Sequence, residues 1–369
     1  MLLNLKFVLP VVLAVHTLAF PVPSQASTTL LKAPLASSME QLEILTRNVQ
    51  HKVPGSKQHQ KAWTHWCVLA IDCIKDELLL NLPHPVDVTT TETLAFQLGM
   101  AADVGIRPCF ANAGSRSGYA MDFFCRARRL ADLFVCSGDR FPEFYTTQMK
   151  ELLLQSTKTC HITSIGGGPG YDVCALALAH AFTGSDCAIE GTIYDFEEGW
   201  SDLVYAMSVS TEGVLRHSRR SLSTTTYHFG GKCDITKSFT DPSNSLLQVS
   251  SADIIVCQYC VAENAHLLRD SDYIFFRDLL VHIKDGAIVI LTETTHRLWP
   301  AFVDLMNDQD FQVAFVRERG TQLVLRKHAG CRHIRPTEEE LRDMKQDALD
   351  HNLKMEGGHT RQRRHERNK

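Results

Sequence analysis

The stretch His161-Ile-Thr-Ser-Ile165-Gly166-Gly167-Gly168-Pro169-Gly170-Tyr171 joins a short apolar segment to a segment with helical periodicity that runs to Phe182. A glycine-rich turn between a strand and a helix allows the backbone to approach a ligand closely, and the N–H groups and dipole at the helix start favour an anionic group. The glycines at 166, 168 and 170 give the spacing GxGxG, because Tyr171 stands where the dinucleotide motif GxGxxG has its last glycine. No GxxxxGK pattern occurs, which excludes a P-loop.

Short apolar segments alternate with helical segments after residue 158. This alternation predicts a parallel, doubly wound α/β sheet with helices between the first six strands. The last two predicted strands are joined by Arg317–Thr321, which leaves no room for a helix and predicts an antiparallel hairpin. The predicted strands are 161–165, 189–194, 224–229, 253–258, 287–292, 311–316 and 322–325.

Polar side chains follow the second and fourth predicted strands, at the edge where ligands bind to such sheets. Asp195 ends the second strand, where a carboxylate can accept hydrogen bonds from both hydroxyls of a ribose. Glu197 and Glu198 come next, at the start of a helix, and favour its dipole. Gln258 and Tyr259 end the fourth strand and are expected to form a wall of the crevice.

The glycine turn, Asp195 and the closing hairpin together resemble the class I S-adenosylmethionine-dependent methyltransferases over about residues 159–328. The resemblance implies a Rossmann-like sheet of seven strands with a terminal antiparallel hairpin, and S-adenosylmethionine as cofactor. It also implies that Asp234, after the third strand, contacts the adenine amino group; a loop acid or a helix cap is the alternative. The predicted cofactor residues are Gly166, Gly167, Gly168, Gly170, Asp195, Asp234, Gln258 and Tyr259.

Ionisable residues gather after the fourth and fifth predicted strands. Methyl transfer to nitrogen or oxygen needs alignment with the sulfonium and often a base for the acceptor proton. Glu263, Glu293 and His296 are therefore the candidate catalytic residues, with a cap or salt-bridge role as the alternative for each. No metal site is predicted, because Cys257-Gln-Tyr-Cys260 lacks a second pair and strand positions i and i+3 point to opposite faces. These two cysteines are interpreted as buried strand thiols.

The methyl acceptor stays open between two substrate classes. In the first hypothesis the acceptor is a small metabolite, methylated at N or O, and helices within residues 39–155 fold over the pocket as a lid. In the second, the chain is an RNA (rRNA or tRNA) methyltransferase. Its phosphate contacts would come from Arg116, Arg126, Arg128, Arg129 and the basic tail 361–369. The net charge of -4 favours the metabolite. A non-catalytic S-adenosylmethionine-binding module is a third alternative.

Four segments are expected along the chain. Residues 1–26 have the pattern of a signal or targeting segment, which a transit-like stretch rich in Ser and Thr extends to about residue 38. Residues 39–157 form a helical extension or cap, with helices predicted over 39–53, 62–82, 91–104, 119–135 and 144–155, and residues 158–328 form the cofactor-binding methyltransferase domain. Residues 329–369 form a polar helix and a basic, disordered tail.

The N-terminal pattern also predicts a compartment. The apolar run from Phe7 to Phe20 is too short to span a bilayer, so no stable membrane span is expected. No acidic residue precedes Glu40, which favours import into a plastid or another organelle. The secretory pathway is the alternative, and the cytoplasm if the apolar run is not a signal. The 12 cysteines at irregular spacing favour free thiols in a reducing compartment.

Overall fold

The computed structural model describes residues 28–49, 56–104, 107–136, 159–218, 224–293, 311–316 and 322–327, with the single residues 299, 302 and 305. Its centre is one sheet with the strand order β3-β2-β1-β4-β5-β7-β6. The first five strands pair in parallel, whereas β7 lies antiparallel between β5 and β6. The strands are β1 (Thr159–Ile165), β2 (Ala188–Asp195), β3 (Thr225–Lys232), β4 (Ile254–Gln258), β5 (Ile288–Thr292), β6 (Phe311–Val316) and β7 (Gln322–Lys327).

Both faces of the sheet are covered. Alternate residues of β4 point to opposite faces, so that Ile254 and Val256 belong to one apolar core and Ile255 and Cys257 to the other. Every residue of β4 and β5 is buried, which explains why these segments are continuous apolar runs rather than alternating ones. The chain crosses from β3, at one edge, to β4 beside β1, so the strand order reverses between β1 and β4. Ligands bind outside the carboxyl ends of strands at such a switch point.

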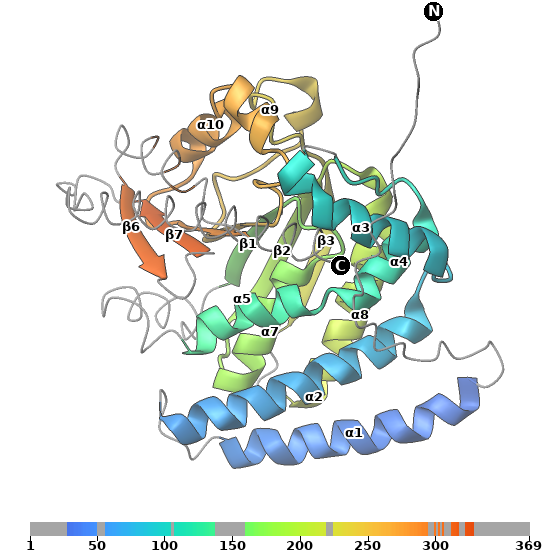
Figure 1. Cartoon of the computed structure of the whole chain (residues 1–369). Helices are drawn as coiled ribbons and strands as arrows, with labels where there is room; N and C mark the ends of the chain where they lie inside the picture. The colour runs from blue at the N-terminus through green and yellow to red at the C-terminus, as the bar shows by residue number, and fades with distance from the viewer. Residues whose placement is uncertain are drawn as a thin grey trace, which may run out of the picture.

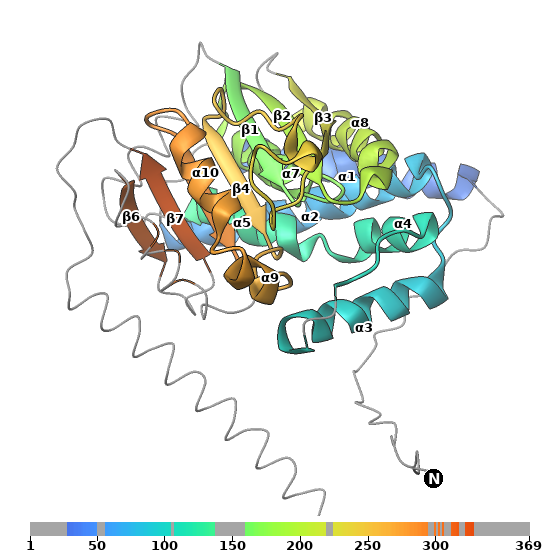
Figure 2. The same cartoon turned by 90° about the horizontal axis from the view of Figure 1, so that it is seen from above.

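The helices divide between the two faces (Figures 1 and 2). Those of the N-terminal part and those that follow β1 and β2 share the first core, and those between β4 and β5 contribute to the second. The helices are α1 (Thr28–Val49), α2 (Lys57–Asn81), α3 (Val88–Val104), α4 (Ala113–Asp122), α5 (Cys125–Cys136), α7 (Tyr171–Thr183), α8 (Ser201–Ser218), α9 (Ala265–Asp270) and α10 (Ile274–His282).

The N-terminal helices continue the core of the sheet domain. The rings of Trp63 and Trp66, on α2, stack 5.9 Å apart, and Phe182 on α7 packs against both at 4.9 and 5.5 Å. Trp63 also donates a hydrogen bond of 2.6 Å from Nε1 to Oδ1 of Asp132. Because a buried indole N–H needs an acceptor, this bond ties α2 to α5. The contact fixes the extension on the outer side of α7.

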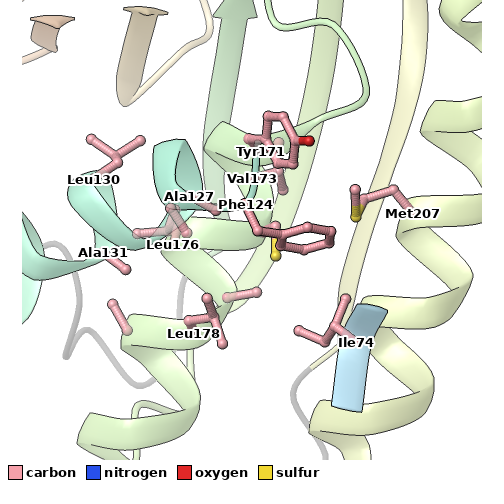
Figure 3. Close-up of a cluster of buried hydrophobic side chains, with 14 of the residues drawn as sticks. Ile74, Phe124, Ala127, Leu130, Ala131, Tyr171, Val173, Leu176, Leu178 and Met207 are labelled. Carbon is pink, nitrogen blue, oxygen red and sulfur yellow. The ribbon is translucent and has the colours of Figure 1, made fainter. Parts of the chain in front are cut away.

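Helix α5 packs directly on α7. Figure 3 shows the cluster that joins them: Phe124, Ala127, Leu130 and Ala131 on the α5 side, Tyr171, Val173, Leu176 and Leu178 on the α7 side, with Ile74 and Met207 beside them. The small side chains of Ala127 and Ala131 let the two helices approach closely. Tyr171 adds a polar link, because its hydroxyl donates to the backbone oxygen of Tyr119 at 2.7 Å.

The predicted mixed α/β sheet, its closing antiparallel pair and the helical N-terminal region are confirmed. The single helix predicted over 119–135 is wrong: α4 begins at Ala113 and ends at Asp122, and α5 begins at Cys125. Asn112 caps α4 by accepting a hydrogen bond of 2.8 Å from the amide of Ser115. Phe124, between the two helices, is buried against the ring of Tyr171, and this packing favours two separate helices over one continuous helix.

The helix predicted between the third and fourth strands is also wrong. Residues 233–253 contain only the 3-10 turn Pro242–Asn244. Asn244 organises this connection, since its side chain accepts from the amide of Asp234 and donates to the carbonyl oxygens of Asp234, Lys237 and Ser238. One buried amide thus satisfies backbone groups that a helix would otherwise pair.

The start of the first helix differs from the prediction, and several predicted segments lie outside the described residues. Helix α1 begins at Thr28, within the stretch predicted to be transit-like, rather than at residue 39. Leucine and alanine in that stretch suit a helix as well as a presequence. The predicted targeting segment 1–26, the helix 144–155 and the tail 329–369 lie outside the described residues. Within the described part of the chain, no helix is both long and apolar enough to cross a membrane.

Replacing Trp63 by Ala tests the docking of the N-terminal helices. Trp63 is fully buried, so we expect Trp63→Ala to lower the free energy of unfolding by about 3–5 kcal/mol, through loss of apolar burial and of the bond to Asp132. Phe96→Ala is the matched control, because Phe96 is 70% exposed and its loss should have little effect. Urea unfolding, followed by far-ultraviolet circular dichroism and not by tryptophan fluorescence, measures the free energy of unfolding of both variants. Equal stability of the two variants would contradict the docking.

Candidate functional site

The glycine turn between β1 and α7 has the backbone that only glycine adopts readily. The φ angles of Gly166, Gly168 and Gly170 are 64°, 50° and 96°. Gly166 also lies against Cys260, whose Sγ would be 2.1 Å from a Cβ at position 166. The glycines of the motif are therefore required both by the turn and by the close approach of the segment that follows β4.

The amides of this turn are bonded inside the protein. Gly166 and Gly167 donate to the backbone oxygen of Tyr194 at 2.7 and 3.3 Å, and Gly170 donates to that of Gly167 at 3.0 Å. Gly168 donates to Oδ2 of Asp195 at 2.9 Å. The sequence-based expectation that these glycine amides face an anionic ligand is not supported. The turn supplies a smooth, narrow surface instead of free donors.

A buried polar triad fixes the turn from beneath. The carboxylate of Asp172, in the first turn of α7, accepts hydrogen bonds from Oγ of Ser164 at 2.6 Å and from Nε2 of Gln258. Burial raises the pKa of Asp172 to about 6. Gln258 is 4% exposed and does not line the cavity described next, so the prediction that it forms a wall is corrected. Its role in the structure is to join β4 to α7.

A cavity of about 280 Å³ lies at the carboxyl ends of β1, β2, β3 and β4. Its walls combine three segments: the turn and strand ends, the residues that follow β4, and the N-terminal extension. The strand-end residues are Gly166, Gly168, Asp195, Phe196, Glu197, Trp200, Cys233 and Ile235. The residues that follow β4 are Tyr259, Cys260, Glu263 and Asn264, and the extension contributes Arg107, Pro108, Cys109, Phe110, Ala111, Tyr119 and Arg126.

Asp195 is the central polar group of the cavity. Its two carboxylate oxygens accept from the amides of Gly168 and Glu197, at 2.9 and 3.0 Å. Burial raises the pKa of Asp195 to about 6, and these two hydrogen bonds oppose that shift. The adjacent Phe196 ring is 41% exposed and lies under the guanidinium of Arg107, 3.6 Å from its centroid. A carboxylate next to an aromatic ring at the cavity wall suits a nucleoside.

Asp234 does not line the cavity, whereas its neighbours Cys233 and Ile235 do. Side chains of successive residues in an extended chain point to opposite sides. Because Cys233 and Ile235 point into the cavity, Asp234 between them points away from it. One carboxylate oxygen, Oδ1, accepts from the amide and the hydroxyl of Thr236 at 3.0 and 2.7 Å. Asp234 therefore bonds within its own loop, which agrees with the alternative of a loop acid and not with a contact to adenine.

Tyr259 forms part of the wall after β4, in a strained conformation. Its φ of 60° is in the left-handed region, which a bulky residue adopts at a cost. Two arginines of α5 hold the side chain. Arg129 donates to the hydroxyl at 2.7 Å, and the guanidinium of Arg126 stands 4.2 Å from the ring centroid. These contacts attach the extension to the sheet edge at the cavity.

The cysteine pair differs from its sequence-based interpretation. Cys257 is buried within β4 as expected. Cys260 follows the end of the strand and lines the cavity, with its thiol 3.4 Å from the backbone oxygen of Gly166. The prediction that Cys260 is a buried strand thiol is therefore wrong, because β4 ends at Gln258.

The three candidate catalytic residues occupy different places. Glu263 lines the cavity, and burial raises its pKa to about 7 against the opposing positive charge of Arg126. Glu293 is 1% exposed, lies outside the cavity wall, and accepts from the amide of Val261 at 2.6 Å. Burial raises the pKa of Glu293 to about 8. His296 lies outside the described residues.

The wall supplied by residues 107–111 is not predicted by the sequence pattern. Arg116 holds this segment, because Nη1 donates to the backbone oxygens of Phe110 and Ala111 at 2.6 and 2.9 Å. Phe110 in turn packs against Tyr119 and Trp200, with ring centroids 5.3 Å away in each case. The only sequence indication of this wall was the run of arginines on the extension, which was assigned to phosphate contacts. Of the four, Arg116 is buried, Arg126 lines the cavity, and Arg129 is exposed but donates to the hydroxyl of Tyr259.

Neither the protein-family models nor the curated proteins contain a match to the chain. Among solved structures, a DszA carbon methyltransferase is 14% identical with a TM-score of 0.36, over 75% of this chain and 71% of that one. Precorrin-6y C5,15-methyltransferase from Geobacter metallireducens is 11% identical with a TM-score of 0.28, over 50% and 88%. A ribosomal protein L11 methylase from Lactobacillus delbrueckii subsp. bulgaricus is 14% identical with a TM-score of 0.27, over 50% and 79%.

TM-scores below 0.5 do not by themselves show a common fold, and the strand order carries the assignment. A parallel sheet that reverses between β1 and β4, a glycine turn after β1 and an antiparallel β7 between β5 and β6 are found together here. The chain has the fold of the class I S-adenosylmethionine-dependent methyltransferases.

Proposed function

We propose that the chain is an S-adenosylmethionine-dependent methyltransferase that acts on a small metabolite, at a nitrogen or oxygen atom. The observation that carries the proposal is the cavity at the switch point of the sheet. The glycine turn and Asp195 bound it on one side, and the N-terminal extension closes it on the other. The fold supports a methyl-donor cofactor, and the closed wall supports a small acceptor.

The nucleoside half of the cofactor matches the residues at the ends of β2 and β3. Asp195 offers carboxylate oxygens to ribose hydroxyls. The turn beside it consists largely of glycines, which its positive φ values require, so few side chains occupy the space where the ribose would lie. Phe196 and Ile235 provide apolar surface for a purine ring. When bound, S-adenosylmethionine supplies an electrophilic methyl group on a sulfonium centre.

Glu263 is a titratable group of the cavity wall that can serve either as a base for the acceptor proton or, when ionised, as the partner of a cationic ligand group. It lines the cavity, and its pKa of about 7 lies near the pH at which a cellular enzyme works. A base with a pKa close to the working pH combines a useful fraction of ionised form with enough basicity to accept a proton. Arg126 stabilises the ionised form and thus keeps this pKa from rising further.

Glu293 is assigned a positioning role. Its carboxyl group receives the amide of Val261, three residues after Gln258 and two before Glu263. The bond fixes the segment that carries Tyr259, Cys260 and Glu263 in the cavity wall. Since Glu293 itself is outside the wall, it reaches no ligand directly.

The extension favours a metabolite over RNA. Seven cavity residues come from it, Arg107 to Ala111 with Tyr119 and Arg126. Three of the arginines proposed as phosphate contacts contact the protein: Arg116 donates to backbone oxygens, Arg126 lies against the Tyr259 ring, and Arg129 donates to the Tyr259 hydroxyl. Profiling methylated products in a cell extract tests the proposal, because an enzyme releases S-adenosylhomocysteine as it modifies one acceptor. A non-catalytic binding module would bind the nucleoside without turnover.

Asp195→Ala tests the cofactor site. We expect the affinity for S-adenosylhomocysteine to fall about tenfold to a hundredfold, because hydrogen bonds to a charged group contribute about 1.5–3 kcal/mol. Isothermal titration calorimetry measures the change. Glu198→Ala removes an exposed carboxylate three residues further along and should leave the affinity unchanged. Unaltered binding by Asp195→Ala would remove the basis for the proposed site.

Glu293→Gln tests the positioning carboxyl through pH. In the unfolded chain this group ionises near 4.5, but burial raises its pKa in the fold to about 8. Its contribution to stability is therefore complete below the unfolded value and declines as the pH rises towards 8. Glutamine can still accept from Val261 and does not ionise. We expect Glu293→Gln to gain melting temperature relative to the wild type, by about 2 °C or more, between about pH 5 and about pH 9.

Differential scanning calorimetry at both pH values measures this relative gain. Glu198→Gln, at an exposed position, should show none. A difference between Glu293→Gln and wild type that is independent of pH would show that Glu293 ionises in the fold as it does in the unfolded chain.

A further inference from the structure

Arg126, on α5, is a half-buried cation. It lines the cavity and lies 4.2 Å from the centroid of the Tyr259 ring. In the described part of the chain, no hydrogen bond or ion pair joins its guanidinium to another residue, in contrast to Arg116 and Arg129. A guanidinium carries five N–H donors, and leaving them unbonded in a half-buried site is costly unless a ligand receives them.

Glu263 is the complementary group. Both residues line the same cavity, and the positive charge of Arg126 lowers the pKa that burial raises at Glu263. The two side chains are nevertheless not ion-paired in the described structure. Two opposite charges that interact across a cavity without contact leave room between them for a ligand that carries both charges. Asn264 lines the same wall, and its Oδ1 accepts no hydrogen bond from the described residues.

The glycine turn cannot take over the role of the cation. The amides of Gly166, Gly167, Gly168 and Gly170 are bonded to Tyr194, Asp195 and Gly167, and Pro169 has no N–H. The next two residues, Tyr171 and Asp172, are buried and do not line the cavity. A carboxylate beside the glycine turn therefore has to be bound by another group, and Arg126 is a cation of the same cavity wall.

We infer that Arg126 and Glu263 form a clamp for the zwitterionic amino-acid end of S-adenosylmethionine, with the carboxylate at Arg126 and the ammonium at Glu263. This inference rests on the proposed function, and of the two roles given there for Glu263 it assigns the one at the ammonium of the cofactor. Bidentate hydrogen bonding fits guanidinium to carboxylate, and the guanidinium lies 4.2 Å from the centroid of the Tyr259 ring, which limits where it can point. Arg126 belongs to α5, so the N-terminal extension completes the cofactor site as well as covering it. An acceptor carboxylate at Arg126 is the competing source of the same chemistry.

Calorimetry on the full chain with three ligands measures the contributions of the carboxylate and the ammonium to affinity separately. S-adenosylhomocysteine carries both charged groups, its decarboxylated analogue carries only the amine, and 5′-methylthioadenosine carries neither. We expect the wild type to bind S-adenosylhomocysteine at least about tenfold more tightly than the decarboxylated analogue, and the analogue more tightly than methylthioadenosine. Equal binding of the first two would overturn the clamp and leave Arg126 to an acceptor carboxylate.

Arg126→Gln should remove the advantage of S-adenosylhomocysteine over its decarboxylated analogue while leaving the affinity for methylthioadenosine unchanged. Glu263→Gln should remove the advantage of the analogue over methylthioadenosine. Arg128→Gln is the matched control on the same helix, because Arg128 does not line the cavity, and it should change none of the three affinities.

A loss by Arg126→Gln that is equal for all three ligands would overturn the inference, since Arg126 would then only shape the cavity. If Arg126→Gln does not fold, Arg126→Lys retains the charge and should keep part of the carboxylate advantage; the wild-type comparison needs no variant. A wild type that binds none of the three ligands would contradict the proposed function itself, whereas binding without discrimination would contradict only the clamp.

Discussion

The hydrogen bond from the amide of Gly168 to the carboxylate of Asp195 joins the ends of two neighbouring parallel strands. It spans 27 residues of sequence and closes the cavity on the side of the sheet. The bond exists because Gly168 adopts a positive φ, which directs its amide towards β2, and because Asp195 is the last residue of that strand. The triad of Ser164, Asp172 and Gln258 supports the same turn from beneath. The shape of the site depends on this small set of contacts.

The extension gives the other half of the site its shape. Its helices bury two tryptophans against α7 and then bring Phe110, Tyr119 and Arg126 over the ends of the strands. The interaction between α5 and Tyr259 holds a strained residue in place and brings the positive charge of Arg126 to the cavity wall. Packing far from the site thus determines the electrostatics within it. In this respect the extension acts as part of the sheet domain and not as an independent cap.

Local patterns were enough to predict the sheet and one side of the site. The alternation of strands and helices, the spacing of the glycines and the acid at the end of β2 follow from short-range rules, and Asp195 lines the cavity as the pattern requires. Asp234 and Gln258 show where such rules stop, since one residue of register or one buried partner turns a side chain away from the cavity. The contacts of Arg126 and Arg129 with Tyr259 link residues about 130 positions apart, and no local pattern contains that information.

A crystal structure of the chain with S-adenosylhomocysteine tests the central claim most directly. The account predicts the nucleoside in the cavity at the ends of β1 to β4, with the ribose hydroxyls at Asp195 and the purine beside Phe196 and Ile235. A ligand bound outside this cavity, or a ribose turned away from Asp195, would contradict it.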